Sequence, residues 1–389
     1  MYKSSNNKQV ILDNVNLKEE INNMKGIAIM LEQDDGTYKE SSTNTFPTDM
    51  KFNSVLSGCI DNLGNKIENS LTYENGIANV ETSNTSYCYL YFNNQSDTEK
   101  MIENVSSEVL WKSTLEDDGY RYVGTDPANY VCFGYSDSST DCDFTNATNS
   151  DLYAYRIIGI FEDSSGEQHL KLIKKEALEK RSDWNADYQT DIDWDESDLY
   201  NGLNGSYFLS NTTYSYMQNI NWLSKIADWD YTVTKTLSSY SDLNIQNIYL
   251  HEMNRSTKTI TTGEWKIVNT KLGLMYVSDY LLSLGSSALL YTSSNESELK
   301  TGWMYIKNSD SNPPYQYEWT MTRHGPGTNG YENIYFAYRI ILGSFGSAPV
   351  GGTAMATVTS YSIRPVFYLT SDVELTGEGI IDNPYIIEN

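Results

Sequence analysis

The residue types that most often carry catalysis are few or badly spaced in this chain. Three histidines occur, His169, His251 and His324, and none lies in an HxxxH or HExxH spacing that would place two metal ligands on one helix face. Serine and aspartate are abundant, but no GxSxG motif supplies a nucleophile elbow. The sequence therefore predicts no serine hydrolase, and we expect a protein that is not an enzyme.

One acidic cluster surrounds a tryptophan. It consists of Asp191, Asp193, Asp195 and Glu196 around Trp194. A pair of carboxylates beside a stacking aromatic ring is typical of a glycosidase. The alternative is a solvated loop ahead of a helix, with Asp195 or Ser197 as the N-cap of that helix.

A second acidic cluster could be a calcium site. Asp137, Asp141 and Asp143 lie close together in the sequence, but their spacing does not match the DxDxDG calcium loop. We therefore expect no metal ion and no cofactor.

The four cysteines form two local pairs. Cys59 and Cys88 flank a strand-rich stretch, and Cys132 and Cys142 bracket a polar loop whose length allows a bridge. Neither pair has the CxxC spacing of a zinc site. Two disulfides in an extracellular protein are the prediction, and four buried free thiols are the alternative.

Composition excludes one class of partner and suggests another. The formal net charge is −25 and lysine and arginine do not cluster, so the chain lacks the basic surface that nucleic-acid binding needs. Its 32 tyrosines and 8 tryptophans, set among many Asn, Ser and Thr residues, can stack and hydrogen-bond as antibody paratopes do. Tyrosine is also a good strand residue, so this composition is compatible with a β-rich protein that binds nothing.

Membrane insertion is not expected. No run of about 18 apolar residues occurs. The first seven residues lack the apolar core of a secretory signal. Either the chain leaves its cell on lysis, as a virion part does, or a leader has been removed.

Patterning divides the chain into four parts. Residues 1–25 have apolar positions near the helical period, which predicts an N-terminal arm or a short helix. Residues 26–93 alternate strand-like runs with turns and predict a small all-β domain. Residues 94–112 are polar and predict a linker. A large domain follows at residues 113–389.

Within the large domain, residues 153–161 and 169–173 predict a hairpin around the Asp-Ser-Ser-Gly turn at 163–166. Residues 196–208 and 214–227 have apolar side chains at helical spacing and predict two helices. Together these segments indicate helices packed on a mixed sheet.

An arginine interrupts an apolar strand near the end of the chain. Arg364 lies in residues 361–369 and is followed directly by Pro365, so this strand is an edge or a bulged one. An unpaired charge in such a strand is too costly to bury. We therefore predict that Arg364 is buried, has a partner and is a structural residue.

Seven short segments, in a fixed order, resemble a known set. They are residues 130–134 (YVCFG), 155–161 (YRIIGIF), 193–194 (DW), 271–280 (KLGLMYVSDY), 318–322 (EWTMT), 361–369 (YSIRPVFYL) and 382–387 (DNPYII). In this order they resemble a domain family of surface proteins of gut Firmicutes and their phages. That family is similar to the C-type-lectin-like fold of phage receptor-binding proteins and formylglycine-generating enzymes.

The resemblance covers residues 113–389 and implies an α+β fold, a C-type-lectin-like mixed domain preceded by the small all-β domain. Formylglycine-generating enzymes use a cysteine pair late in the chain, whereas no cysteine follows Cys142 here, so that activity does not carry over. The Glu-Pro-Asn or Gln-Pro-Asp sugar motif of calcium-dependent lectins is also missing.

The resemblance further implies a ligand surface on the late loops, where aromatic and arginine side chains are typical binding residues. The candidates are Trp303, Tyr315, Arg323, His324, Tyr331 and Tyr338. We expect a receptor-binding or adhesive protein, foremost a phage tail or fibre component at the virion surface, that recognises a host-surface glycan or protein. It would form a homo-oligomer and contact other virion proteins through its N-terminal arm. The alternatives are a bacterial cell-surface adhesin and a polysaccharide-degrading enzyme.

Overall fold

The structure is a computed structural model of the whole chain. It describes residues 15–17, 24–33, 35–43, 45–48, 50–74, 76–80, 86–112, 119–135, 142, 144, 152–178, 182–185, 193–234, 245–253, 265–285, 301–305, 317–326, 335–341, 344–349 and 361–387. The chain divides into two compact units, Met1–Ser96 and Asp97–Asn389.

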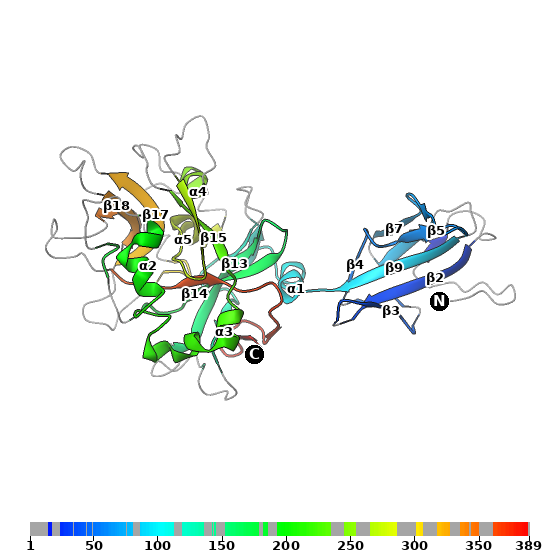
Figure 1. Cartoon of the computed structure of the whole chain (residues 1–389), viewed down its shortest axis with the longest axis horizontal. Helices are drawn as coiled ribbons and strands as arrows, with labels where there is room; N and C mark the ends of the chain where they lie inside the picture. Colours follow the sequence, from blue (N-terminus) through cyan, green and yellow to red (C-terminus); the bar gives the residue numbers. More distant parts are fainter. Residues whose placement is uncertain are drawn as a thin grey trace. The chain divides into compact units, whose positions relative to one another are not determined.

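The first unit is all-β in its described residues (Figure 1). Its strands are β1 (Val15–Leu17), β2 (Met24–Glu32), β3 (Tyr38–Glu40), β4 (Met50–Phe52), β5 (Gly58–Ile60), β6 (Lys66–Ile67), β7 (Leu71–Glu74), β8 (Ile77–Val80) and β9 (Ser86–Asn94). One sheet has the order β3-β2-β9-β5-β6, with β4 also paired to β9, and a smaller sheet has the order β1-β8-β7.

Alternation along β9 builds the core of this unit. Cys88, Leu90 and Phe92 are buried, whereas the tyrosines between them are half-buried, as expected when successive side chains of a strand face opposite sides. Ala78 and Val80 of the smaller sheet belong to the same apolar cluster, so the two sheets share one core.

The prediction of two disulfides is confirmed. Cys59 on β5 and Cys88 on β9 are direct cross-strand partners and are bonded to each other. Cys132, at the end of a strand in the second unit, is bonded to Cys142. No cysteine is free, which excludes the free-thiol alternative.

The structure describes two short parts of residues 1–25, the segment predicted as an N-terminal arm or a short helix, and both are strands. Val15–Leu17 form β1, which pairs in parallel with β8, and β2 begins at Met24. Val15 and Leu17 are two residues apart, so their spacing fits the period of a strand as well as it fits a helix.

The second unit mixes strands and short helices. Its elements are α1 (Asp97–Asn104), β10 (Leu110–Lys112), β11 (Tyr120–Tyr122), β12 (Tyr130–Cys132), β13 (Ala154–Glu162), β14 (Gln168–Lys174), the 3₁₀ helix η3 (Trp194–Glu196), α2 (Asp198–Leu203), the 3₁₀ helix η4 (Thr212–Gln218), α3 (Ile220–Ser224), β15 (Trp229–Thr234), α4 (Ile245–Glu252), β16 (Trp265–Thr270), α5 (Val277–Leu282), β17 (Tyr317–Pro326), β18 (Tyr335–Ile341), β19 (Ser344–Pro349), β20 (Val366–Tyr368), β21 (Leu375–Thr376) and β22 (Tyr385–Ile387). Every helix within the described ranges is too short or too polar to cross a membrane.

The predicted hairpin is the centre of the main sheet. β13 and β14 pair antiparallel around the turn after Glu162. The sheet continues from β13 through β12 to β22 and β21, and from β14 to β20. A bulge in β13 lies between Ile157 and Gly159, and only glycine fits there because a Cβ on Gly159 would lie 2.0 Å from the Tyr120 carbonyl oxygen.

Most of the segment predicted as a linker, residues 94–112, belongs to the second unit. It contains α1 and β10, and the boundary between the units falls after Ser96. Met101 and Leu110 are buried in the core of this unit, and the Asp97 carboxylate accepts a hydrogen bond from the Leu375 amide at 2.5 Å. This polar segment has so few apolar residues that their spacing shows no clear helical or strand period, so the sequence does not predict these elements.

The two predicted helices are shorter than expected. The segment 196–208 contains α2, which follows η3, and the segment 214–227 contains the end of η4 and all of α3. The Asn219 side chain accepts a hydrogen bond from the Asn221 amide and caps α3, which interrupts the second helix. Asparagine competes in this way with helical hydrogen bonding.

Candidate functional site

Three antiparallel strands carry three of the predicted ligand residues. β17, β18 and β19 form a sheet of their own, here called the late sheet. Arg323 and His324 lie on β17 and Tyr338 lies on β18, but their side chains are outside the described residues. Arg323 is opposite Ala337, and the β17–β18 register shifts on both sides of it. Such bulges re-aim side chains and are frequent next to functional sites.

The N-terminal half of β17 is embedded in the domain core. The side chains from Glu318 to Thr322 are all buried, and Trp319 and Thr320 have no exposed surface. The Trp319 indole nitrogen donates to the Ser182 carbonyl at 2.8 Å. The Met321 amide donates to the Met275 carbonyl at 2.9 Å. The described half of β17 is therefore part of the domain core.

A buried ion pair fixes the first residues of β17. Arg364 is 3% exposed, and its Nε and Nη2 donate to the two carboxylate oxygens of Glu318 at 2.5 and 3.0 Å. Arg364 Nη2 also donates to the Met304 carbonyl at 3.0 Å and lies 3.8 Å from Met275 Sδ. The predicted burial and pairing of Arg364 are thereby confirmed, and its partner is Glu318.

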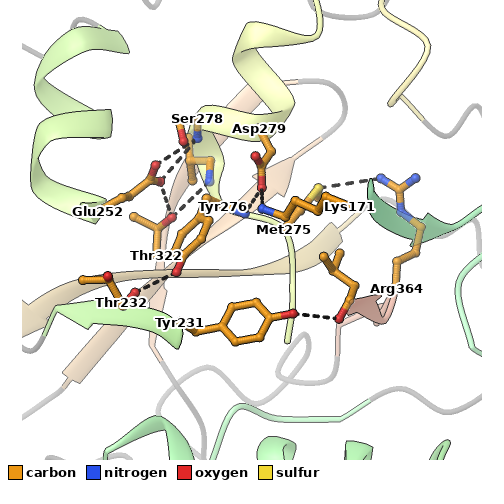
Figure 2. A network of polar contacts seen from close by, with 12 residues as sticks. Lys171, Tyr231, Thr232, Glu252, Met275, Tyr276, Ser278, Asp279, Thr322 and Arg364 are labelled. Carbon is orange, nitrogen blue, oxygen red and sulfur yellow. Dashed lines mark hydrogen bonds and ion pairs between the residues drawn. The ribbon is translucent and has the colours of Figure 1, made fainter. Parts of the chain in front are cut away.

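A second buried ion pair joins β14 to α5 (Figure 2). Lys171 Nζ of β14 donates to Asp279 Oδ2 at 2.6 Å, and both side chains are almost fully buried. The same oxygen accepts from the Tyr276 amide at 2.9 Å, so Asp279 also holds the start of α5. Burial lowers the pKa of Lys171, and Asp279 acts in the opposite direction.

Glu252 of α4 connects α5 to β17. The Thr322 hydroxyl donates to Glu252 Oε1 and accepts from the Val277 amide at 3.0 Å. The Ser278 amide lies 3.3 Å from both carboxylate oxygens. Burial raises the pKa of Glu252 to about 7, although these hydrogen bonds oppose the rise. Thr322, the residue before Arg323, is thus held from two helices (Figure 2).

Tyr231 and Gly273 both contact Val366 of the main sheet. The Tyr231 hydroxyl donates to the Val366 carbonyl at 3.3 Å (Figure 2). Gly273 pairs with Val366 and leaves room for the Tyr231 ring, because a Cβ on Gly273 would lie 2.6 Å from that ring. The glycine of the 271–280 segment therefore has a packing role.

These charged groups join β14, α4, α5 and β17 inside the core, where they are shielded from solvent. Lys171, Glu252, Asp279 and Arg364 are each 3% exposed or less, and each hydrogen-bonds to another buried group. A substrate would need access to them, which this burial denies. Of the four, only Arg364 is predicted from the sequence to be a buried structural residue.

Trp303 has a packing role in the structure. Its side chain is buried and its indole nitrogen donates to the Tyr122 carbonyl at 2.8 Å. The Arg156 guanidinium lies 5.0 Å from its ring centre. Trp303 is therefore not an exposed binding residue, whereas Tyr315 and Tyr331 lie outside the described residues.

Within its described residues, the acidic cluster lacks an exposed aromatic face beside its carboxylates. Trp194 is fully buried, so it offers no face to a sugar. Asp193 and Asp195 both pair with Lys266 Nζ, at 3.4 and 2.6 Å. Ser197 accepts from the Tyr200 amide and caps α2, as one of the two predicted N-caps.

The remaining acidic residues of the two clusters, Asp137, Asp141, Asp143 and Asp191, lie outside the described residues. Comparison of the chain with protein-family models, with curated proteins and with solved structures finds no match.

Proposed function

We propose that the chain is a non-enzymatic receptor-binding or adhesive protein whose late sheet carries the ligand surface. The observation that supports this most lies within β17, where a buried and hydrogen-bonded run from Glu318 to Thr322 is followed directly by Arg323, and the register of pairing with β18 shifts on both sides of Arg323. Binding residues are commonly carried by irregular segments that a rigid scaffold positions.

The proposed fold of residues 113–389 is C-type-lectin-like, as the resemblance of the sequence implies. A mixed sheet with few short helices is compatible with it. The proposed setting is a phage tail or fibre at the virion surface, with a host-surface glycan or protein as ligand. Two disulfides are consistent with an oxidising, extracellular location.

The ligand surface would consist of Arg323, His324, Tyr331 and Tyr338, with Tyr315 on the preceding segment. Arginine and tyrosine dominate binding energy at many interfaces because they combine large contact area with hydrogen-bonding groups. Trp303 is left out of this proposed surface because of its burial.

The proposal is tested by incubating the full chain with a panel of intact gut Firmicutes and with their purified cell-wall polysaccharides, and by measuring its retention and the release of reducing ends. We expect saturable retention on at least one strain or polysaccharide and no release of reducing ends. Release of reducing ends would show an enzyme instead. Absence of retention across the panel would contradict a cell-surface receptor-binding role.

A further inference from the structure

A histidine and two carboxylates converge at the turn of the β13–β14 hairpin, far in sequence from the late sheet. Asp163 follows β13, Glu167 ends the turn and His169 is the second residue of β14. One ligand atom from each of the three lies within 4.8 Å of those of the other two. Neither the fold network nor the proposed ligand surface uses these residues.

His169 presents an unused lone pair to this cluster. The residue is 6% exposed, and its Nδ1 lies 2.7 Å from the Leu369 carbonyl oxygen. Because a carbonyl only accepts, Nδ1 carries the hydrogen and Nε2 carries the lone pair in the neutral ring. Nε2 is buried and has no hydrogen-bond partner among the described residues. The Trp229 ring packs edge-on against the imidazole, with 5.3 Å between ring centres, and fixes its orientation.

The atom that faces His169 Nε2 is a carboxylate oxygen. Asp163 Oδ2 lies 3.5 Å from Nε2. The other oxygen, Oδ1, accepts from the Ser165 amide, the Ser165 hydroxyl and the Glu167 amide at 2.7 to 2.9 Å. The carboxylate is therefore held with Oδ2 toward the imidazole. Two electron-pair donors at this distance repel each other unless a positive charge lies between them.

The distance between His169 Nε2 and Asp163 Oδ2 is longer than an ionic hydrogen bond and close to the distance between two ligand atoms on one metal ion. A charge-assisted N–H···O bond is about 2.7–2.9 Å long. Ligand atoms at about 2.0–2.1 Å from a tetrahedral zinc ion lie about 3.3 Å apart. The 3.5 Å between Nε2 and Oδ2 is near the second value. Glu167 is exposed, and one of its oxygens accepts from the Ser371 hydroxyl at 2.8 Å.

A matched turn in the first unit has only one of the three ligand groups, so the turn alone does not create the cluster. Asp61 begins a turn of the same hydrogen-bond pattern, with its Oδ1 accepting from the Leu63 and Asn65 amides. The position that corresponds to Glu167 is Asn65, and the one that corresponds to His169 is Ile67. The carboxylate and the imidazole are what distinguish the β13–β14 turn.

We propose that Asp163, Glu167 and His169 bind a divalent transition-metal ion, with zinc as the best fit. Zinc takes His nitrogen together with Asp and Glu oxygen, whereas calcium and magnesium prefer oxygen alone. The Leu369 carbonyl on Nδ1 orients the imidazole, as outer-shell partners of metal-binding histidines do. Three protein ligands leave a fourth position of the ion open, on the side where Glu167 is exposed.

Isothermal titration of the full chain with zinc chloride, in excess magnesium to cover weak acidic sites, tests the proposal. We expect one zinc ion per chain. Asp163→Asn and Glu167→Gln should each weaken zinc binding at least about tenfold, because even outer-shell substitutions cost about 10–100-fold. Zinc should also raise the melting temperature of the parent more than that of either variant.

Two variants keep this experiment decisive. Asp61→Asn alters the matched turn and should leave zinc binding unchanged. Glu167→Gln changes an exposed side chain, so it tests binding without threatening the fold, whereas His169→Gln alters a buried one. Absence of stoichiometric zinc binding by the parent, or equal zinc affinity in the parent and Glu167→Gln, would overturn the proposal.

Discussion

Arg364 and Glu318 join the last part of the chain to the base of the late sheet. Their side chains form two hydrogen bonds, at 2.5 and 3.0 Å, inside the core. Paired donors of this kind fix orientation as well as distance, since the guanidinium and the carboxylate are both planar. The pair therefore fixes the start of β17, the strand that continues to Arg323.

Removal of one member of the Arg364–Glu318 pair should destabilise the protein more than removal of both members. Arg364→Met leaves Glu318 buried without its cation and should lower the free energy of unfolding by about 3–5 kcal/mol. The double variant Arg364→Met, Glu318→Leu should recover much of this loss, because no charge remains buried. Urea denaturation of the three proteins measures the difference. Equal stability of parent and Arg364→Met would contradict the pairing.

Glu252 should make stability depend on pH. Its pKa is raised from 4.5 to about 7 in the folded protein. Below pH 4.5 both folded and unfolded states are protonated; between pH 4.5 and 7 the unfolded state loses its proton first, so stability falls as pH rises. The fall due to this group should total about 3 kcal/mol and level off above pH 7.

Glu252→Gln removes this contribution, because glutamine resembles the protonated acid and does not titrate. Urea denaturation from pH 4 to pH 8 should show a flatter profile for Glu252→Gln than for the parent. Glu108→Gln, at an exposed position, is the control and should follow the parent. Parallel profiles for Glu252→Gln and the parent would contradict the raised pKa.

The disulfides should differ in their effect on stability. Cys59–Cys88 closes a separation of 29 residues and Cys132–Cys142 one of 10 residues. Loop-closure entropy predicts a contribution of about 3 to 4 kcal/mol for the longer loop and about 3 kcal/mol for the shorter one. Paired alanine substitutions with thermal unfolding measure each. Detection of four thiols in the unfolded, unreduced chain would contradict both bridges.

Features with a local signal were predictable from the sequence. The β13–β14 hairpin has its turn residues between two apolar runs, and each cysteine pair lies within a short segment. Arg364 was conspicuous as a charge in an apolar strand. Lys171 has the same signal, between Leu170 and Leu172, and could have been found by the same reasoning.

Other features depend on contacts that sequence spacing does not show. The partners of Lys171 and Thr322 lie 108 and 70 residues away, in Asp279 and Glu252. Tryptophan is a residue type typical of binding surfaces, but tertiary packing buries Trp303. Asp163, Glu167 and His169, by contrast, lie within seven residues in the predicted hairpin, so their convergence was open to sequence reasoning that did not look only for a second histidine at helical spacing.

The central claim is that the late sheet and its neighbouring segment bind a host-surface ligand. It is tested most directly by the affinity of the full chain for the retained cell or polysaccharide, compared among the parent, Arg323→Ala and Tyr331→Ala. Each substitution should weaken binding at least about tenfold, because such residues typically contribute about 2 kcal/mol or more. Glu196→Gln, in the acidic cluster, should bind like the parent, and all four proteins should have the same melting temperature. Equal affinity of the parent and both alanine variants would contradict the account.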